Sequence, residues 1–230
     1  MREIVFDTET TGLDPLQGHR LIEIGCIELV NRFPSGRVFH RYLNPERDVP
    51  AEAYAVHGLS NDFLRDKPFF SEIADDLIAF IDDAALVAHN ALFDLSFLNA
   101  ELDRCAKVTI ARDRLVDTLM LARRRHPAGP NSLDHLCARY GIDNSHRTKH
   151  GALLDAELLA EVYIELVGGR QASLILVDTG ARSQAAAGRR NGAAPRRPIP
   201  IGPRVSEIEL TAHTQFIDRM GDKAIWLDYR

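Results

Sequence analysis

The chain has 230 residues, of which 45% are apolar and 27% charged, a composition typical of a soluble globular protein. Its apolar runs are far shorter than the ~20 residues of a membrane-spanning helix, and we expect no signal peptide. Three widely spaced cysteines exclude a disulfide scaffold and a cysteine zinc site, which favours the cytoplasm. The net charge of −5 is unevenly spread, because residues 1–178 hold 19 basic and 28 acidic side chains. This acidity disfavours an autonomous nucleic-acid-binding protein, since phosphate affinity comes largely from Lys and Arg.

The apolar pattern of the first 168 residues predicts strands first and then alternating strands and helices. Three strands are predicted, over residues 3–7, 21–30 and 38–43. They are followed by a helix over 72–82, a buried strand over 86–88, and helices over 91–104, 117–125, 132–140 and 152–167. This order predicts an α/β fold with a mixed sheet flanked by helices.

Composition divides the rest of the chain. Residues 179–204 contain six Arg, six Ala, four Gly and four Pro but no acid. Such a segment cannot bury enough apolar surface to offset the entropy of ordering it. We therefore predict a domain over 1–170, a short segment over 171–178, a flexible linker over 179–204 and a short helical tail over 205–230.

The tail has the pattern of one amphipathic helix. Ser206 and Glu209 match the S-x-x-E capping box that begins a helix. Ile208, Phe216 and Met220 recur at a helical spacing and form an apolar stripe. Because so short a segment cannot form a stable core alone, we expect it to bind a partner protein. Folding back onto its own domain is the alternative.

Two carboxylates lie at the end of the first predicted strand. Asp7 and Glu9 are separated by one residue, so in an extended chain they point to the same face. Gly12 then turns the chain away. An isolated D-x-E pair is ordinarily a solvated strand end. The apolar residues before Asp7 favour burial instead, and two buried like charges require a cation.

A third acid and a histidine with a fourth acid follow later. Asp94 falls in the first turn of the helix over 91–104, where an acid also suits the helix dipole. His150 and Asp155 are five residues apart and would lie on different faces of one helix. Gly151 allows His150 to lie on the preceding loop and Asp155 on the helix, although a surface histidine is the common alternative.

The four acids and His150 share one chemical explanation. Oxygen ligands select hard cations such as Mg²⁺ and Mn²⁺. Two such ions ~3.5–4 Å apart stabilise both the attacking and the leaving oxygen of a phosphoryl displacement. A neutral histidine beside them can take the proton of the attacking water.

The motifs that carry these residues occur in a characteristic order: D-T-E-T-T-G at 7–12, H-N-A-L-F-D at 89–94 and H-G-A-L-L-D-A at 150–156. Together they resemble the DEDDh family of 3′→5′ exonucleases, which has a ribonuclease-H-like fold. Within that family they are similar to the proofreading (epsilon) subunits of bacterial DNA polymerase III. The resemblance covers residues 2 to about 170 strongly and the tail around Trp226 more weakly. It implies hydrolysis of mispaired 3′-terminal nucleotides of a DNA primer strand to nucleoside 5′-monophosphates.

The resemblance also implies a role for each matched residue. Asp7 would bridge two Mg²⁺ or Mn²⁺ ions, and Glu9 and Asp155 would complete the site of the attacking water. Asp94 would support the second ion, and His150 would be the general base. Residues from several segments would bind the 3′-terminal nucleotide, namely Thr8, Thr10, Gly12, Leu13, His57, Asn90 and Phe93.

Two segments are candidate partner-binding elements. Gln171, Leu174 and Leu176 resemble the Q-x-x-L-x-[FL] peptides that bind the bacterial sliding clamp, but packing of this segment on its own domain is an equal alternative. The tail is expected to bind the catalytic subunit of the replicative polymerase, with Phe216 and Trp226 as candidate anchors. A small stabilising subunit is a further candidate partner.

Two other functions are compatible with these motifs. A DEDDh exoribonuclease that trims RNA 3′ ends would use the same catalytic residues. A stand-alone ribonuclease, however, has no evident use for the linker and the tail. A structural subunit with an inactive nuclease domain is disfavoured, because the acids and His150 are intact.

Overall fold

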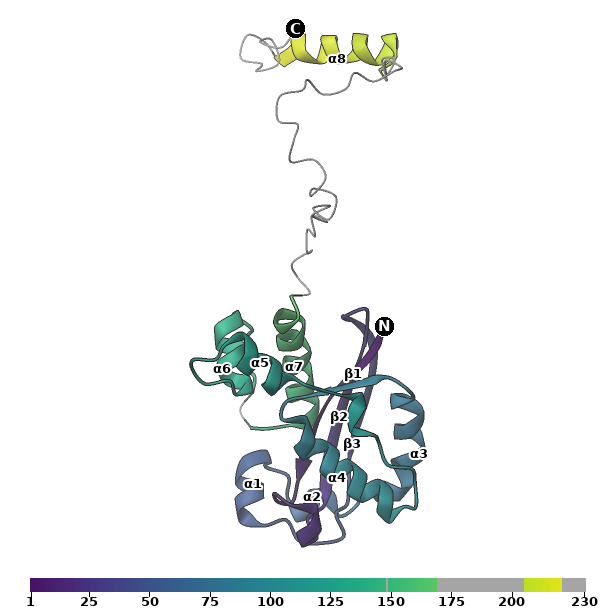
Figure 1. The fold of residues 1–230 in the computed structure, drawn as a ribbon, viewed down its shortest axis with the longest axis vertical. Coiled ribbons are helices and arrows are strands. Elements are labelled where there is room, and N and C mark those ends of the chain that lie inside the picture. The colour runs from purple at the N-terminus through teal and green to yellow at the C-terminus, as the bar shows by residue number, and fades with distance from the viewer. Residues whose placement is uncertain (148, 169–204, 221–230) are drawn as a thin grey trace, which may run out of the picture. The chain divides into compact units, whose positions relative to one another are not determined.

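The computed structural model describes residues 1–147, 149–168 and 205–220, which fall into two units that are considered separately (Figure 1). The segment over 171–178, the linker over 179–204 and Trp226 lie outside the described residues. The division of the chain into domain, segment, linker and tail therefore stays a prediction. None of the described helices is long and apolar enough to cross a membrane.

A five-stranded mixed sheet forms the centre of the first unit, with the strand order β3-β2-β1-β4-β5. The strands are β1 (Arg2–Thr10), β2 (Leu21–Val30), β3 (Phe33–Tyr42), β4 (Ala85–Ala88) and β5 (Leu115–Asp117). β1 pairs antiparallel with β2 and parallel with β4. Only Glu3–Val5 pair with β4, whereas the ladder with β2 continues to Thr10. The acidic end of β1 therefore extends beyond β4.

Helices cover both faces of this sheet. They are α1 (Ala51–His57), α2 (Asn61–Leu64), α3 (Phe70–Ile81), α4 (Ala91–Arg104), α5 (Thr118–Arg125), α6 (Leu133–Tyr140) and α7 (Ala152–Leu166), with short 3₁₀ turns η1 (Pro15–Gln17) and η2 (Arg112–Arg114). One apolar core packs α3 and α4 against Ile4 and Phe6 of β1. The other packs α5, α6 and α7 against Val5, whose side chain points to the opposite face.

The predicted architecture is confirmed, and the differences have physical reasons. β2 and α4 have the predicted bounds. β1 continues through the polar residues Glu9 and Thr10, because pairing with β2 satisfies their backbone groups. α1 was not predicted because it lacks an apolar stripe, and His57 is its only buried residue. β5 has only three residues, which is too short for a periodic signal.

The second unit contains α8 (Glu207–Met220), and its predicted capping box is present. The backbone nitrogen of Ser206 donates to Glu209 Oε2 at 2.8 Å, and the backbone nitrogen of Glu209 donates to Ser206 Oγ at 3.3 Å. Ile208, Phe216 and Met220 are exposed, whereas Ile217, which the predicted stripe omits, is buried. The three side chains of the stripe are thus exposed on the described helix.

Candidate active site

Three elements meet at the extended end of β1 and carry the four predicted acids. Asp7 and Glu9 lie on β1, Asp94 lies in the first turn of α4, and Asp155 lies in the first turn of α7. All four line one cleft of about 310 Å³. We call it the carboxylate cleft. Glu9, Asp94 and Asp155 are buried. The structure therefore brings the four acids together away from water, where buried like charges require a cation.

The place of Asp155 depends on a close approach between β2 and α7. Gly25 is paired with Asp7 across the β1–β2 ladder. A Cβ atom at Gly25 would lie 2.4 Å from the backbone nitrogen of Leu153, in the first turn of α7. Only glycine therefore leaves room for this turn, which carries Asp155, to contact the sheet beside Asp7.

Asp94 is held by the strand that carries the first two acids. Thr8 Oγ1 donates to Asp94 Oδ1 at 2.7 Å. The turn before α4 is held as well, because the backbone nitrogen of Asn90 donates to Asp117 Oδ1 at 3.2 Å. Asn90 has a left-handed backbone with φ 66°, which asparagine tolerates better than most residues. Its side chain is exposed and is not among those that line the cleft.

The cleft holds more acidic than basic side chains. Arg147 is the only Lys or Arg among its described lining residues. Burial raises the pKa of Glu9 to about 8 and that of Asp94 to about 7. Burial and the carboxylates of Asp94 and Glu9 raise the pKa of Asp7 well above its ordinary range. Divalent cations would stabilise the ionised forms of these acids, and a set of carboxylate oxygens suits hard cations.

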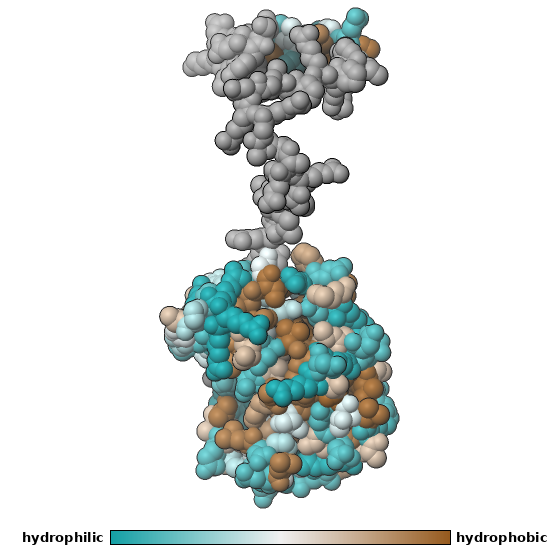
Figure 2. Space-filling view, in the orientation of Figure 1, coloured by the Kyte–Doolittle hydropathy of each residue, from teal (hydrophilic) through white to brown (hydrophobic). Residues whose placement is uncertain are grey.

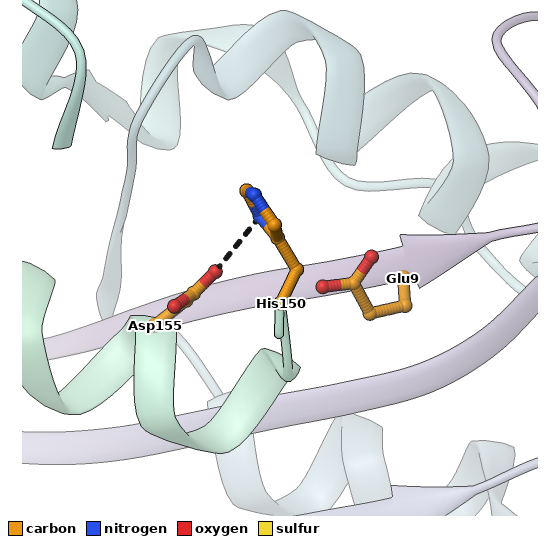
Figure 3. A group of neighbouring side chains, drawn as sticks. All are labelled: Glu9, His150 and Asp155. Atoms are coloured by element: carbon orange, nitrogen blue, oxygen red, sulfur yellow. Dashed lines mark ion pairs between the residues drawn. The ribbon is translucent and has the colours of Figure 1, made fainter. Parts of the chain in front are cut away.

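His150 lies on the loop before α7, as the spacing argument allows. One ligand atom from each of Glu9, His150 and Asp155 lies within 4.8 Å of the other two (Figure 3). The imidazole Nδ1 is 3.3 Å from Asp155 Oδ2. The side chain is 48% exposed, so it reaches the cleft from its rim.

Arg147 belongs to this site and was missed by sequence reasoning. It donates to Asp155 from Nε to Oδ1 at 2.5 Å and from Nη2 to Oδ2 at 2.7 Å. Its Nη1 donates to Asp134 at 2.8 Å, and its Nη2 lies 2.8 Å from His150 Nδ1. The side chain is only 8% exposed. In the sequence, Arg147 is a single arginine three residues before His150. No spacing rule distinguishes such an arginine from a surface residue.

A second cavity, of about 540 Å³, adjoins the carboxylate cleft and shares Thr8, Glu9 and Phe93 with it. We call it the nucleotide pocket, after the role that the sequence predicts for its lining residues. Of the predicted substrate-binding residues, its lining includes Thr8, Thr10, Gly12, Leu13, His57 and Phe93, but not Asn90. Glu52 of α1 also lines the pocket. Sequence reasoning missed Glu52 because it missed α1.

His57 lines this pocket and has a defined tautomer. Its Nδ1 accepts from the backbone nitrogen of Leu59 at 2.9 Å, so the neutral ring carries its proton on Nε2. Burial, with smaller contributions from Lys149 and His150, lowers the pKa of His57 to about 4. Nε2 is buried and has no hydrogen-bond partner among the described residues. A buried unpaired donor is costly, so this nitrogen is an unsatisfied polar atom beside the pocket.

Comparisons with known proteins place the chain in one family. The family model described as exonuclease matches residues 4–163. The chain is 50% identical to DNA polymerase III subunit epsilon of Rickettsia conorii over 224 residues, which is 96% of each protein. It is 51% identical to the Escherichia coli K12 subunit over 176 residues, covering 74% of this chain and 72% of that protein.

Solved structures share the fold at low sequence identity. Exonuclease I aligns with a TM-score of 0.63 at 19% identity, over 74% of this chain and 41% of that one. The nuclease domain of 3′hExo, a DEDDh family member bound to rAMP, aligns with a TM-score of 0.61 at 16% identity, over 73% and 92%. The chain therefore belongs to the exonuclease family and, within it, to the epsilon subunits of bacterial DNA polymerase III, and it is a 3′→5′ exonuclease.

Proposed function

We propose that this chain removes mispaired 3′-terminal nucleotides from a DNA primer strand by hydrolysis, releasing nucleoside 5′-monophosphates. One observation carries the proposal: four carboxylates and His150 converge in a cleft that adjoins a 540 Å³ pocket. That volume is within the range of small-ligand sites. A mispaired end unpairs at a lower free-energy cost, so it enters such a site more often than a paired end.

DEDDh exonucleases use divalent metal ions, and the carboxylates of the cleft fit such ions. In our proposal Asp7 would help to hold both of two Mg²⁺ or Mn²⁺ ions. Glu9 and Asp155 would complete the site of the attacking water, and Asp94 would support the second ion. When bound, the ions would activate that water and stabilise the charge on the leaving oxygen.

The chain's own residues would position the reactants and move the proton. His150 is the proposed base that takes the proton from the attacking water. Its Nδ1 lies beside Arg147 and Asp155, and the side chain already lines the cleft. His57 would lie beside the terminal nucleotide, and Leu13 and Phe93 would provide apolar surface for its base.

The proposed partners follow from the family and from the tail. The tail over 205–230 would bind the catalytic subunit of the polymerase, with Phe216 and Trp226 as anchors. The segment containing Gln171, Leu174 and Leu176 would bind the sliding clamp, and a small subunit is a further candidate. As a replication enzyme the chain would work in the cytoplasm.

The direct test measures mononucleotide release in Mg²⁺ from matched single-stranded DNA and RNA. We expect DNA to be degraded from its 3′ end, and Asp7→Asn to abolish the reaction while the protein stays folded. His150→Ala should lower the rate by about 10²- to 10⁴-fold and leave Mn²⁺ binding in place. Preferential degradation of RNA would favour the exoribonuclease alternative, and an active Asp7→Asn enzyme would exclude the proposed metal site.

A further inference from the structure

A third cavity, of about 680 Å³, adjoins the carboxylate cleft on the side of α5. Its lining comes from α5, from the loop between α5 and α6, and from His89 after β4. It includes Arg123 but no Asp or Glu among the described residues, although residues 1–178 are strongly acidic. We call it the basic groove.

The three cavities follow one another in a fixed order. The carboxylate cleft shares Thr8, Glu9 and Phe93 with the nucleotide pocket, and it shares His89 and Ser132 with the basic groove. The nucleotide pocket and the basic groove have no lining residue in common. The carboxylate cleft therefore lies between the other two.

From this order we infer that the basic groove binds the DNA strand immediately upstream of the scissile phosphate, and that Arg123 contacts a phosphate of that strand. The inference rests on the proposed function. If the terminal nucleotide occupies the nucleotide pocket and the scissile phosphate lies at the carboxylates, the penultimate nucleotide leaves the cleft away from the nucleotide pocket. The basic groove shares lining residues with the cleft and none with the nucleotide pocket, so it offers that path.

The walls of the basic groove are already fixed. His89 Nδ1 is 2.9 Å from Thr118 Oγ1. Asn131 Nδ2 donates to the carbonyl oxygen of His126 at 3.1 Å, and Arg139 donates to Asn131 Oδ1 at 3.1 Å. A groove with fixed walls loses little conformational freedom when it binds a strand.

Arg123, in contrast, is free to bind a ligand. Its side chain is exposed, and it makes no hydrogen bond or ion pair with the described residues. Figure 2 shows hydrophilic side chains gathered over the region of α5 and α6. The Arg123 guanidinium lies beside the proposed catalytic cleft and is not part of an ion pair among the described residues. Its geometry and charge suit a hydrogen-bonded contact with a backbone phosphate.

The experiment compares Arg123→Gln with Arg124→Gln, a matched control on the same exposed turn of α5 that does not line the groove. Two substrates distinguish binding of the upstream strand from hydrolysis of the scissile bond. One is a single-stranded DNA oligonucleotide. The other is the p-nitrophenyl ester of thymidine 5′-monophosphate, which has one phosphodiester bond and no upstream nucleotide.

We expect Arg123→Gln to raise KM for the oligonucleotide about five- to tenfold, with kcat preserved. The slope of log affinity against log salt concentration should shrink by about 0.7. Hydrolysis of the ester should match wild type, and Arg124→Gln should behave as wild type on both substrates. Unchanged oligonucleotide kinetics in Arg123→Gln, or an equal loss on the ester, would overturn the inference. A wild-type protein that hydrolyses neither substrate would instead overturn the proposed function.

Discussion

Arg147 binds Asp155 through both carboxylate oxygens, at 2.5 Å from Nε and 2.7 Å from Nη2. The same Nη2 lies 2.8 Å from His150 Nδ1. One guanidinium thus contacts the acid that we expect to bind a metal ion and the histidine that we expect to act as base. Arg147 provides positive charge to the carboxylate cleft in the metal-free protein, and an ion bound at Asp155 would share that role.

Arg147→Gln should destabilise the metal-free protein more than the metal-bound protein. Both side chains of the pair are almost completely buried, and removal of one partner from such a pair costs ~3 kcal/mol. A bound ion would replace much of the lost charge. Urea denaturation in EDTA and in saturating Mn²⁺ measures the difference. Arg147→Lys keeps the positive charge and should lose less stability than Arg147→Gln. Equal losses of stability with and without Mn²⁺ would contradict the role of Arg147 as the positive charge of the metal-free cleft.

The stability of the metal-free protein should fall as pH rises from about 5 to 8. The pKa of Glu9 is raised from 4.5 to about 8 and that of Asp94 from 3.8 to about 7. In this interval the folded state binds more protons than the unfolded state, so raising pH favours unfolding. Chemical denaturation in EDTA at several pH values measures the slope. Glu9→Gln and added Mg²⁺ should each flatten the profile, and a flat wild-type profile would show that these acids are ionised without a metal.

Gly25→Ala should displace the first turn of α7 and lower the exonuclease rate. The new Cβ would lie 2.4 Å from the backbone nitrogen of Leu153, and overpacking of this kind costs ~1–3 kcal/mol. The rate should be compared at a temperature at which the variant is folded. Gly151→Ala is the stability control, because a Cβ there would meet nothing within 4 Å. Wild-type activity in folded Gly25→Ala would mean that the approach of α7 does not position Asp155.

Phe216→Ala should weaken binding to the polymerase catalytic subunit by ~2 kcal/mol. Phe216 is exposed on the apolar stripe of α8, and exposed aromatic side chains are frequent interface anchors. Gln215→Ala, on the same helix, is the control. Deletion of 205–230 should abolish co-elution with the polymerase in size-exclusion chromatography and preserve hydrolysis of single-stranded DNA. Undiminished co-elution would exclude the tail as the binding element.

The local sequence pattern by itself determined several helices and strands and the position of His150. Alternating apolar residues predicted β2 with its observed bounds, and a 3.6-residue period predicted α4. The S-x-x-E pattern predicted the start of α8, and the five-residue spacing before Asp155 predicted that His150 precedes α7. Each of these features depends on residues that are near one another in the chain, so a sequence pattern can record it.

Tertiary structure alone decided which distant residues share a site. Arg147, Glu52 and Arg123 carry no motif, and they acquire a role only because folding places them at the cavities. Gly25 matters because another helix approaches it, and the backbone nitrogen of Asn90 ties the turn before α4 to Asp117. Contacts of this kind join residues far apart in the sequence, and their geometry is set by the packing of α4, α5 and α7 on the sheet, which no local periodicity encodes.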